Sequence, residues 1–323
     1  MVQFRILGPV RAFPGNGGDD LLEPLQPLQK LFLAVLVAAA GQPVTIERLI
    51  DQIWGSYLTP RSRLQTCAYR VRTVLRDTYG EADPVPSQDG AYRLAATPEQ
   101  LDVCAFRSLA AQAQAAARRG DDAAAAQLAR QALSQWAPHG WLLHGPEPLA
   151  GLPGTWADGY RRTLRREYHD TLLGQFQADL RRGLHERMLP RLAMLADSDD
   201  EGRADEQLAG LLMQAAYRSG RQAEALHAYR RLQDALKRQG LEPGKEVRML
   251  EERIHRQDPA LELGAGEGQR DQESTGARED PEGTDSTEAP AGGAVINNFS
   301  QNNLGYHLNV SQGGTQNITY GGK

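Results

Sequence analysis

The feature that most constrains the fold is a long run of alanine-rich helical segments between about Asp102 and Leu261. The piece FRSLAAQAQAAARRGDDAAAAQLARQALSQW has the pattern of a helix, a Gly-Asp turn and a second helix. The same pattern returns in LAGLLMQAAYRSGRQAEALHAYRRLQDALKRQGLEPG, and strand signals are almost absent from the whole region. The sequence therefore predicts an all-α domain that covers about half of the chain.

These helical pairs resemble tetratricopeptide repeats, in which a pair of about 34 residues stacks on its neighbours because it cannot bury its apolar face alone. Small residues at the turn and on the facing surfaces let the two helices of a pair cross closely. In the second piece the pattern is carried by Tyr217, Gly220, Ala223, Ala225, Tyr229 and Leu232. We therefore expect a tetratricopeptide-like helical domain over residues 98–262.

The first 97 residues carry both strand and helix signals. The segment FRILGPVRAF fits two short strands broken by a Gly-Pro pair, which favours a small antiparallel sheet. An apolar stripe of helical period begins at Pro27 and is closed by Gly41, and Thr45 is placed to cap a second helix that Gly55 ends. Farther on, PVPSQDGAYRLAA predicts a β-hairpin with its Asp-Gly pair in the turn.

Between the second helix and the hairpin lies RSRLQTCAYRVRTVLR, residues 61–76, with five arginines and no acid in a chain of net charge −5. Thr59 and Pro60 are predicted to cap this helix and to occupy its first position. On a helical wheel one stripe is apolar and faces inward: Leu64, Cys67, Ala68, Val71, Val74 and Leu75. The free face is basic and hydroxyl-bearing, and its arginines repel one another unless an anion relieves the repulsion.

Double-stranded DNA is the anion that fits this face best, because a helix enters the major groove and arginine reads guanine with two hydrogen bonds. The order helix, helix, hairpin is that of a winged helix-turn-helix, with the arginine helix in the recognition position. The candidates for base or nearby phosphate contact are Arg63, Thr66, Tyr69 and Arg70. The other candidates on the free face or the hairpin, assigned mainly to phosphates, are Arg61, Arg72, Thr73, Arg76 and Arg93. The alternative interpretation is that the arginines only keep a surface helix soluble.

Composition and short motifs narrow the classes of protein to which this chain can belong. No apolar stretch approaches the roughly 18 residues that a membrane span needs, and the first ten residues do not form a secretory signal, so we expect a cytoplasmic, nucleoid-associated protein without membrane contact. The two cysteines, Cys67 and Cys104, suggest neither a disulfide framework nor a zinc site. Because the sequence offers no paired nucleophile and base, no clustered metal ligands and no phosphate loop, we expect no enzymatic activity, no cofactor and no metal.

The C-terminal part of the chain contains two regions of different amino-acid composition. Residues 263–293 are predicted to be a disordered linker, because residues 264–293 hold eight acids against two arginines and no aromatic or β-branched aliphatic residue. Residues 294–323 are rich in Asn and Gln and repeat a short motif at Asn298, Asn309 and Asn317. Such an uncharged, β-prone tail resembles the segments through which bacterial amyloid-signalling proteins add strands to a partner, although a tail without any role is an equal alternative.

Taken in order, several motifs of residues 1–262 resemble the SARP family of actinobacterial antibiotic regulatory proteins. These motifs are FRILGPV, LQKLFLAVLVAAAGQPVTIERLIDQIWG, PRSRLQTCAYRVRTVLR, DGAYRL, YRSGRQAEALHAYRRLQDAL and LEPGKEVRMLEERIHRQDPAL. The resemblance implies a mainly α fold: an OmpR-type winged helix over residues 1–97 with small β-sheets, followed by a bacterial transcriptional activator domain over residues 98–262. It places the family's recognition helix on residues 61–79 and its wing on residues 85–94.

The resemblance further implies a transcriptional activator that binds direct repeats near the promoter's −35 element as two protomers. It also implies recruitment of RNA polymerase through its sigma factor, in the control of secondary-metabolite genes. The alternative is a signalling adaptor, assembled through the helical repeats and a self-associating tail, in which the winged helix mainly binds protein. A combination is also open, in which the acidic linker competes with DNA for the arginine face.

Overall fold

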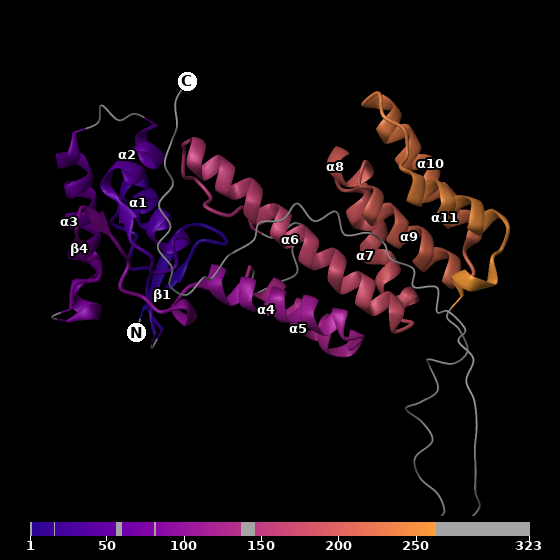
Figure 1. The fold of residues 1–323 in the computed structure, drawn as a ribbon, viewed down its shortest axis with the longest axis horizontal. Coiled ribbons are helices and arrows are strands. Elements are labelled where there is room, and N and C mark those ends of the chain that lie inside the picture. The colour runs from indigo at the N-terminus through magenta and orange to yellow at the C-terminus, as the bar shows by residue number, and fades with distance from the viewer. Residues whose placement is uncertain (1, 16, 56–59, 81, 137–145, 263–323) are drawn as a thin grey trace, which may run out of the picture. The chain divides into compact units, whose positions relative to one another are not determined.

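The computed structural model describes residues 2–15, 17–55, 60–80, 82–136 and 146–262. These residues belong to one compact unit, and Figure 1 shows their helices and strands. The predicted acidic linker and β-prone tail lie outside the described residues, as does the predicted cap Thr59. None of the described helices is long and apolar enough to cross a membrane.

The chain begins with the small antiparallel sheet that the sequence predicts. Strand β1 (Val2–Arg5) pairs with β2 (Arg11–Pro14), with Phe4 opposite Ala12. Val2, Phe4 and Ala12 point into the core, while the alternate positions face outward. One face of this sheet is therefore available to pack on the helices that follow.

Three helices then form the helical part of the winged helix. Helix α1 (Pro27–Ala38) carries the apolar stripe and is buried from Leu31 to Val37, whereas Leu28 near its start is exposed. Helix α2 (Ile46–Trp54) begins as predicted: the Thr45 side chain accepts a hydrogen bond from the Arg48 N–H, and Gly55 ends the helix with φ 65°. Helix α3 spans Arg61–Tyr79. The prediction for its start was wrong in one detail, because Pro60 has an extended backbone and lies at the N-cap instead of the first helical position.

The wing is a three-stranded antiparallel sheet of short strands in the order β3 (Val44–Thr45), β5 (Ala91–Tyr92), β4 (Ser87–Gln88). The predicted hairpin is confirmed, since β4 and β5 pair across a two-residue turn. Asp89 and Gly90 both have positive φ values, 52° and 73°, as a type I′ turn requires. The Asp-Gly pair therefore sets the register of the wing.

The rest of the described chain is helical. It consists of a 3-10 turn Pro98–Gln100, helices α4 (Asp102–Arg118), α5 (Asp122–Ser134), α6 (Thr155–Arg181), α7 (His185–Asp197), α8 (Asp200–Arg203), α9 (Glu206–Arg218), α10 (Gln222–Arg238) and α11 (Lys245–His255), and a 3-10 turn Pro259–Leu261.

Both helical hairpins that the sequence predicts are present. Helix α5 packs on α4 and α6, and α9 packs on α7 and α10, as Figure 1 shows. Gly120 and Gly220 occupy equivalent places in the two turns, with φ values of 77° and 71°. Only glycine adopts this conformation without strain, and it lets the chain reverse within three residues.

The sheet and the helical region share one apolar core that runs from Val2 to Leu261. The half-buried Asp102 carboxylate accepts hydrogen bonds from the backbone N–H groups of Ile6 and Leu7, at 2.9 and 3.0 Å. Burial raises the pKa of Asp102 to about 6, and the hydrogen bonds from the amides oppose that shift. The N–H of Leu149, close before α6, donates to the carbonyl of Ile6 at 3.1 Å. The segment that directly follows β1 is thus held by two separate parts of the helical region.

Candidate nucleic-acid interface

Helix α3 turns its apolar stripe toward α1 and α2. The buried residues are Leu64, Cys67, Ala68, Val71 and Leu75, as the wheel predicts, whereas Val74 is only half-buried because it lies at the edge of the stripe. Burial raises the pKa of the Cys67 thiol, which disfavours the reactive thiolate. Cys67 is therefore a core residue of this helix.

The opposite face of α3 is exposed and carries most of the predicted contact residues. Those with exposed side chains are Arg61, Arg63, Thr66, Tyr69, Arg70, Thr73 and Arg76. Tyr69 is 59% exposed, so both its ring and its hydroxyl are accessible to a ligand. Within the described residues, the guanidinium groups of Arg63, Arg70 and Arg76 make no hydrogen bond or ion pair. Their positive charge is thus open to an external anion.

Arg61 stands at the start of this face but has a protein partner. Its guanidinium contacts the Glu47 carboxylate of α2 at 2.8 Å, and both side chains are more than half exposed. A surface ion pair of this kind contributes roughly 0–1 kcal/mol, so a phosphate can replace Glu47 at little cost.

The two threonine hydroxyls on this face are turned inward along the helix. Thr66 donates to the Ser62 carbonyl and Thr73 donates to the Tyr69 carbonyl, each at 2.9 Å. A phosphate oxygen only accepts hydrogen bonds, so these hydroxyls would have to rotate before they could bind one. In their present orientation they offer only acceptor lone pairs to a ligand.

Arg72 differs from the other arginines because it is engaged within the protein. Its Nε donates to the Asp83 carboxylate at 3.0 Å, its Nη2 donates to the Val85 carbonyl, and its guanidinium lies 5.7 Å from the centre of the Tyr92 ring. The Asp83 and Val85 partners precede the wing strands, and Tyr92 is on β5. Arg72 therefore fastens α3 to the wing, a role that the sequence analysis missed because Asp83 is separated from it by eleven residues.

A second contact fixes the far end of α3 against the wing. The Tyr79 hydroxyl donates to the Ala95 carbonyl at 3.0 Å, and burial raises the pKa of Tyr79 to about 12. Arg93 follows β5, and its side chain is exposed. Arg93 therefore belongs to the wing that the Arg72 and Tyr79 contacts fasten to α3. Among the described residues no group of three or more His, Cys, Asp or Glu side chains is placed to hold a metal ion.

Comparisons with known proteins bear on the whole described chain. The family model of the bacterial transcriptional activator domain matches residues 101–255. The regulatory protein AfsR of Streptomyces griseus is 33% identical over 271 residues, which is 82% of this chain and 26% of AfsR. The regulatory protein DnrI of Streptomyces peucetius is 28% identical over 270 residues, which is 81% of this chain and 94% of DnrI. The chain belongs to the SARP family.

A solved structure supports the fold of this SARP-family chain. Mycobacterium tuberculosis EmbR, solved in complex with a low-affinity phosphopeptide, matches with a TM-score of 0.70 and 24% identity over 80% of this chain and 66% of EmbR. The expected fold class is thereby confirmed: a mainly α protein with small N-terminal sheets. The SARP-family chain spans about a quarter of the length of AfsR and nearly all of DnrI.

Proposed function

We propose that this SARP-family protein is a sequence-specific, DNA-binding transcriptional activator without catalytic activity. The observation that carries the proposal is the exposed face of α3, on which Arg63, Arg70 and Arg76 have no partner among the described residues, beside a wing that is fastened to the helix. The names of the relatives, a regulatory protein in each case, agree with this role. In this proposal residues 1–97 bind DNA, and residues 98–262 form the activator domain.

Arg63 and Arg70 are the proposed base-reading residues. They lie seven residues apart on one flank of α3, so their Cα atoms are separated by about 10.5 Å along the helix axis. That spacing is about the length of three base-pair steps, and each guanidinium can take a guanine in the major groove. Tyr69 lies between them and is proposed to contact a nearby base or phosphate.

The remaining arginines are proposed to position the protein on the duplex. Arg61 and Arg76, near the two ends of α3, would bind phosphates, and Arg93 would bind a phosphate or enter the minor groove from the wing. We assign Arg72 to wing attachment instead of phosphate contact, since its guanidinium already has three protein partners.

The finer features of the proposal come from the family. Two protomers would bind direct repeats near the −35 element of a promoter and recruit RNA polymerase through its sigma factor. Because paired helix-turn-helix units bind half-sites separated by whole helical turns, we expect the two repeats to have such a spacing. The target genes would be those of secondary metabolism, and the protein would act in the cytoplasm at the nucleoid.

The test is a selection of random duplex DNA on the full-length chain, repeated with Arg63→Ala/Arg70→Ala and with the control Arg118→Ala/Arg119→Ala. The control removes the same charge from the exposed end of α4. We expect a direct repeat to be enriched by the wild-type chain and the control, and lost in the α3 variant. Equal enrichment by all three proteins would contradict base reading by α3. No enrichment by the wild-type chain would favour the adaptor alternative.

A further inference from the structure

A surface pocket of about 410 Å³ lies among α5, α6 and α7, in the helical region and away from α3. The residues that line it are Arg130, Gln175, Phe176, Asp179, Arg182, Leu184, Arg187, Met188 and Arg191. Its volume falls within the range of about 300–1,000 Å³ that is typical of small-molecule sites. The DNA-binding proposal makes no use of this pocket.

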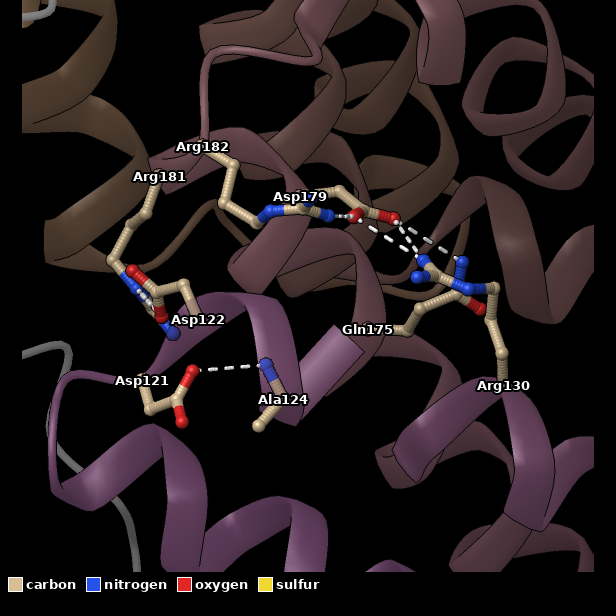
Figure 2. Close-up of polar contacts among 8 residues, drawn as sticks. All are labelled: Asp121, Asp122, Ala124, Arg130, Gln175, Asp179, Arg181 and Arg182. Carbon is tan, nitrogen blue, oxygen red and sulfur yellow. Dashed lines mark hydrogen bonds and ion pairs between the residues drawn. The ribbon is translucent and has the colours of Figure 1, made fainter. Parts of the chain in front are cut away.

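The pocket has a strong positive charge. Four of its lining residues are arginines and one is a carboxylate, for a formal net charge of +3. Asp179 is 7% exposed and accepts hydrogen bonds from Nη1 of Arg130, at 3.2 Å, and from Nη1 of Arg182, at 3.0 Å (Figure 2). One carboxylate cannot neutralise four guanidinium groups, so the remaining charge favours a multivalent anion over a single carboxylate.

Some of the N–H donors of the pocket arginines remain available to a ligand. A guanidinium has five N–H donors, and the hydrogen bonds from Arg130 and Arg182 to Asp179 use one nitrogen of each. The exposed Arg187 makes no hydrogen bond or ion pair within the described part of the chain. Arg191 lies with its guanidinium 5.4 Å from the centre of the Phe176 ring.

The buried side chain of Gln175 is a second observation that indicates a ligand in this pocket. It is only 5% exposed, and its Nε2 donates to the Asp179 carboxylate at 3.3 Å. This contact determines the orientation of the amide, because the reversed amide would place two oxygens against each other. The Oε1 atom is therefore left buried without a hydrogen-bond partner, which is costly unless a ligand supplies a donor.

We propose that this pocket binds a small multivalent anion that also carries a hydroxyl group: a phosphorylated metabolite or a polycarboxylic hydroxy acid. The anionic groups bind Arg182, Arg187 and the free nitrogens of Arg130, and the hydroxyl donates to Oε1 of Gln175. Phe176, Leu184 and Met188 supply apolar surface for the rest of the molecule. A guanidinium can bind either a phosphate or a carboxylate group through two parallel hydrogen bonds, so the pocket fits both kinds of ligand.

The test is isothermal titration calorimetry on the full-length chain, with adenosine diphosphate and citrate as the two hydroxyl-bearing probes and pyrophosphate as the probe without a hydroxyl. The main variant is Arg187→Gln, and the matched control is Arg181→Gln. Arg181 is adjacent in sequence to Arg182, but its side chain points to Asp122, which it contacts at 2.7 Å (Figure 2). Arg63→Ala/Arg70→Ala serves as a control for anion binding at α3.

We expect at least one hydroxyl-bearing probe to bind. Binding of adenosine diphosphate would indicate a phosphorylated ligand, and binding of citrate would indicate a polycarboxylic one. Arg187→Gln should weaken that binding about tenfold, the size expected for one charge-assisted hydrogen bond at a partly exposed site. Neither Arg181→Gln nor the α3 variant should change it. Binding of neither hydroxyl-bearing probe at millimolar concentration, or equal weakening by Arg181→Gln and Arg187→Gln, would overturn the proposal.

The hydroxyl contact is tested with Gln175→Leu, which removes the acceptor and keeps a side chain of similar size. We expect this variant to weaken the hydroxyl-bearing probe and to leave pyrophosphate unchanged. Equal weakening of both probes would contradict a specific role of Oε1, and circular-dichroism melting of each variant checks that the fold persists.

Discussion

The attachment of the wing to α3 depends on Arg72, and its removal is the most informative perturbation of the DNA-binding module. The Arg72 side chain is 28% exposed, and its guanidinium bonds to Asp83 and to the Val85 carbonyl and lies against the Tyr92 ring. Arg72→Ala leaves the Val85 carbonyl without this donor and removes a contact between α3 and β5.

The size of the effect follows from these contacts. A hydrogen bond to a charged group contributes about 1.5–3 kcal/mol, and a half-exposed cation–π contact adds about 0.5–1 kcal/mol. Because neighbouring contacts are not additive, we expect Arg72→Ala to lower the free energy of unfolding by about 2 kcal/mol. For a compact unit of this size that corresponds to a fall in Tm of about 4–8 °C.

The assay pairs thermal melting with DNA-binding measurements on Arg72→Ala, Arg72→Lys and Arg76→Ala. Lysine keeps the charge but cannot reproduce the planar fork, so Arg72→Lys should recover only part of the lost stability. Arg76 is exposed and has no partner within the described residues, so Arg76→Ala should change Tm by about 1 °C or less while weakening DNA binding. The reasoning would be refuted if Arg72→Ala and Arg76→Ala had the same Tm, or if Arg72→Lys behaved like the wild-type protein.

Three further predictions concern other parts of the molecule. If Arg76 binds a phosphate, Arg76→Ala should reduce the slope of log K against log salt concentration by about one unit on every DNA sequence, whereas Arg118→Ala should leave the slope unchanged. His169 contacts the Asp205 carboxylate at 2.6 Å, and this hydrogen bond raises the pKa of His169 above its ordinary value of 6.5. Above the acid range in which Asp205 is protonated, the ion pair therefore stabilises the fold fully up to about pH 6.5 and is lost as pH rises through the higher folded-state pKa of His169. Chemical denaturation of His169→Gln should lack this loss at the higher pH. Asp102→Ala would leave three backbone N–H groups, those of Ile6, Leu7 and Val103, without their acceptor and should lower the free energy of unfolding by about 3 kcal/mol. Unchanged amide exchange at Ile6 and Leu7 would contradict that role.

Local sequence signals predicted the elements of the DNA-binding module well. The cap at Thr45, the glycine stop at Gly55 and the Asp89-Gly90 turn are short-range devices, and each acts within four residues of the chain. The apolar stripe of α3 was predictable for the same reason, because helical periodicity alone decides which side chains face inward. The family resemblance then identified the order of these elements.

Contacts between distant residues were not predictable in this way. From its place on the helical wheel, Arg72 was predicted to contact a DNA phosphate, and only the fold shows that Asp83, Val85 and Tyr92 surround its guanidinium. The arginine pocket was missed entirely, since Arg130 and Asp179 lie 49 residues apart and belong to different helices.

The sequence by itself determined the order of helices and strands in the DNA-binding module, which of their faces are apolar, and that one helix carries a row of arginines without acids. The tertiary structure decided which of those arginines remain free and which are paired, and it gathered four others around a single buried carboxylate. The physical reason is that local conformation depends on near neighbours along the chain, whereas the charge that a side chain presents depends on every group that folding brings within a few ångströms of it.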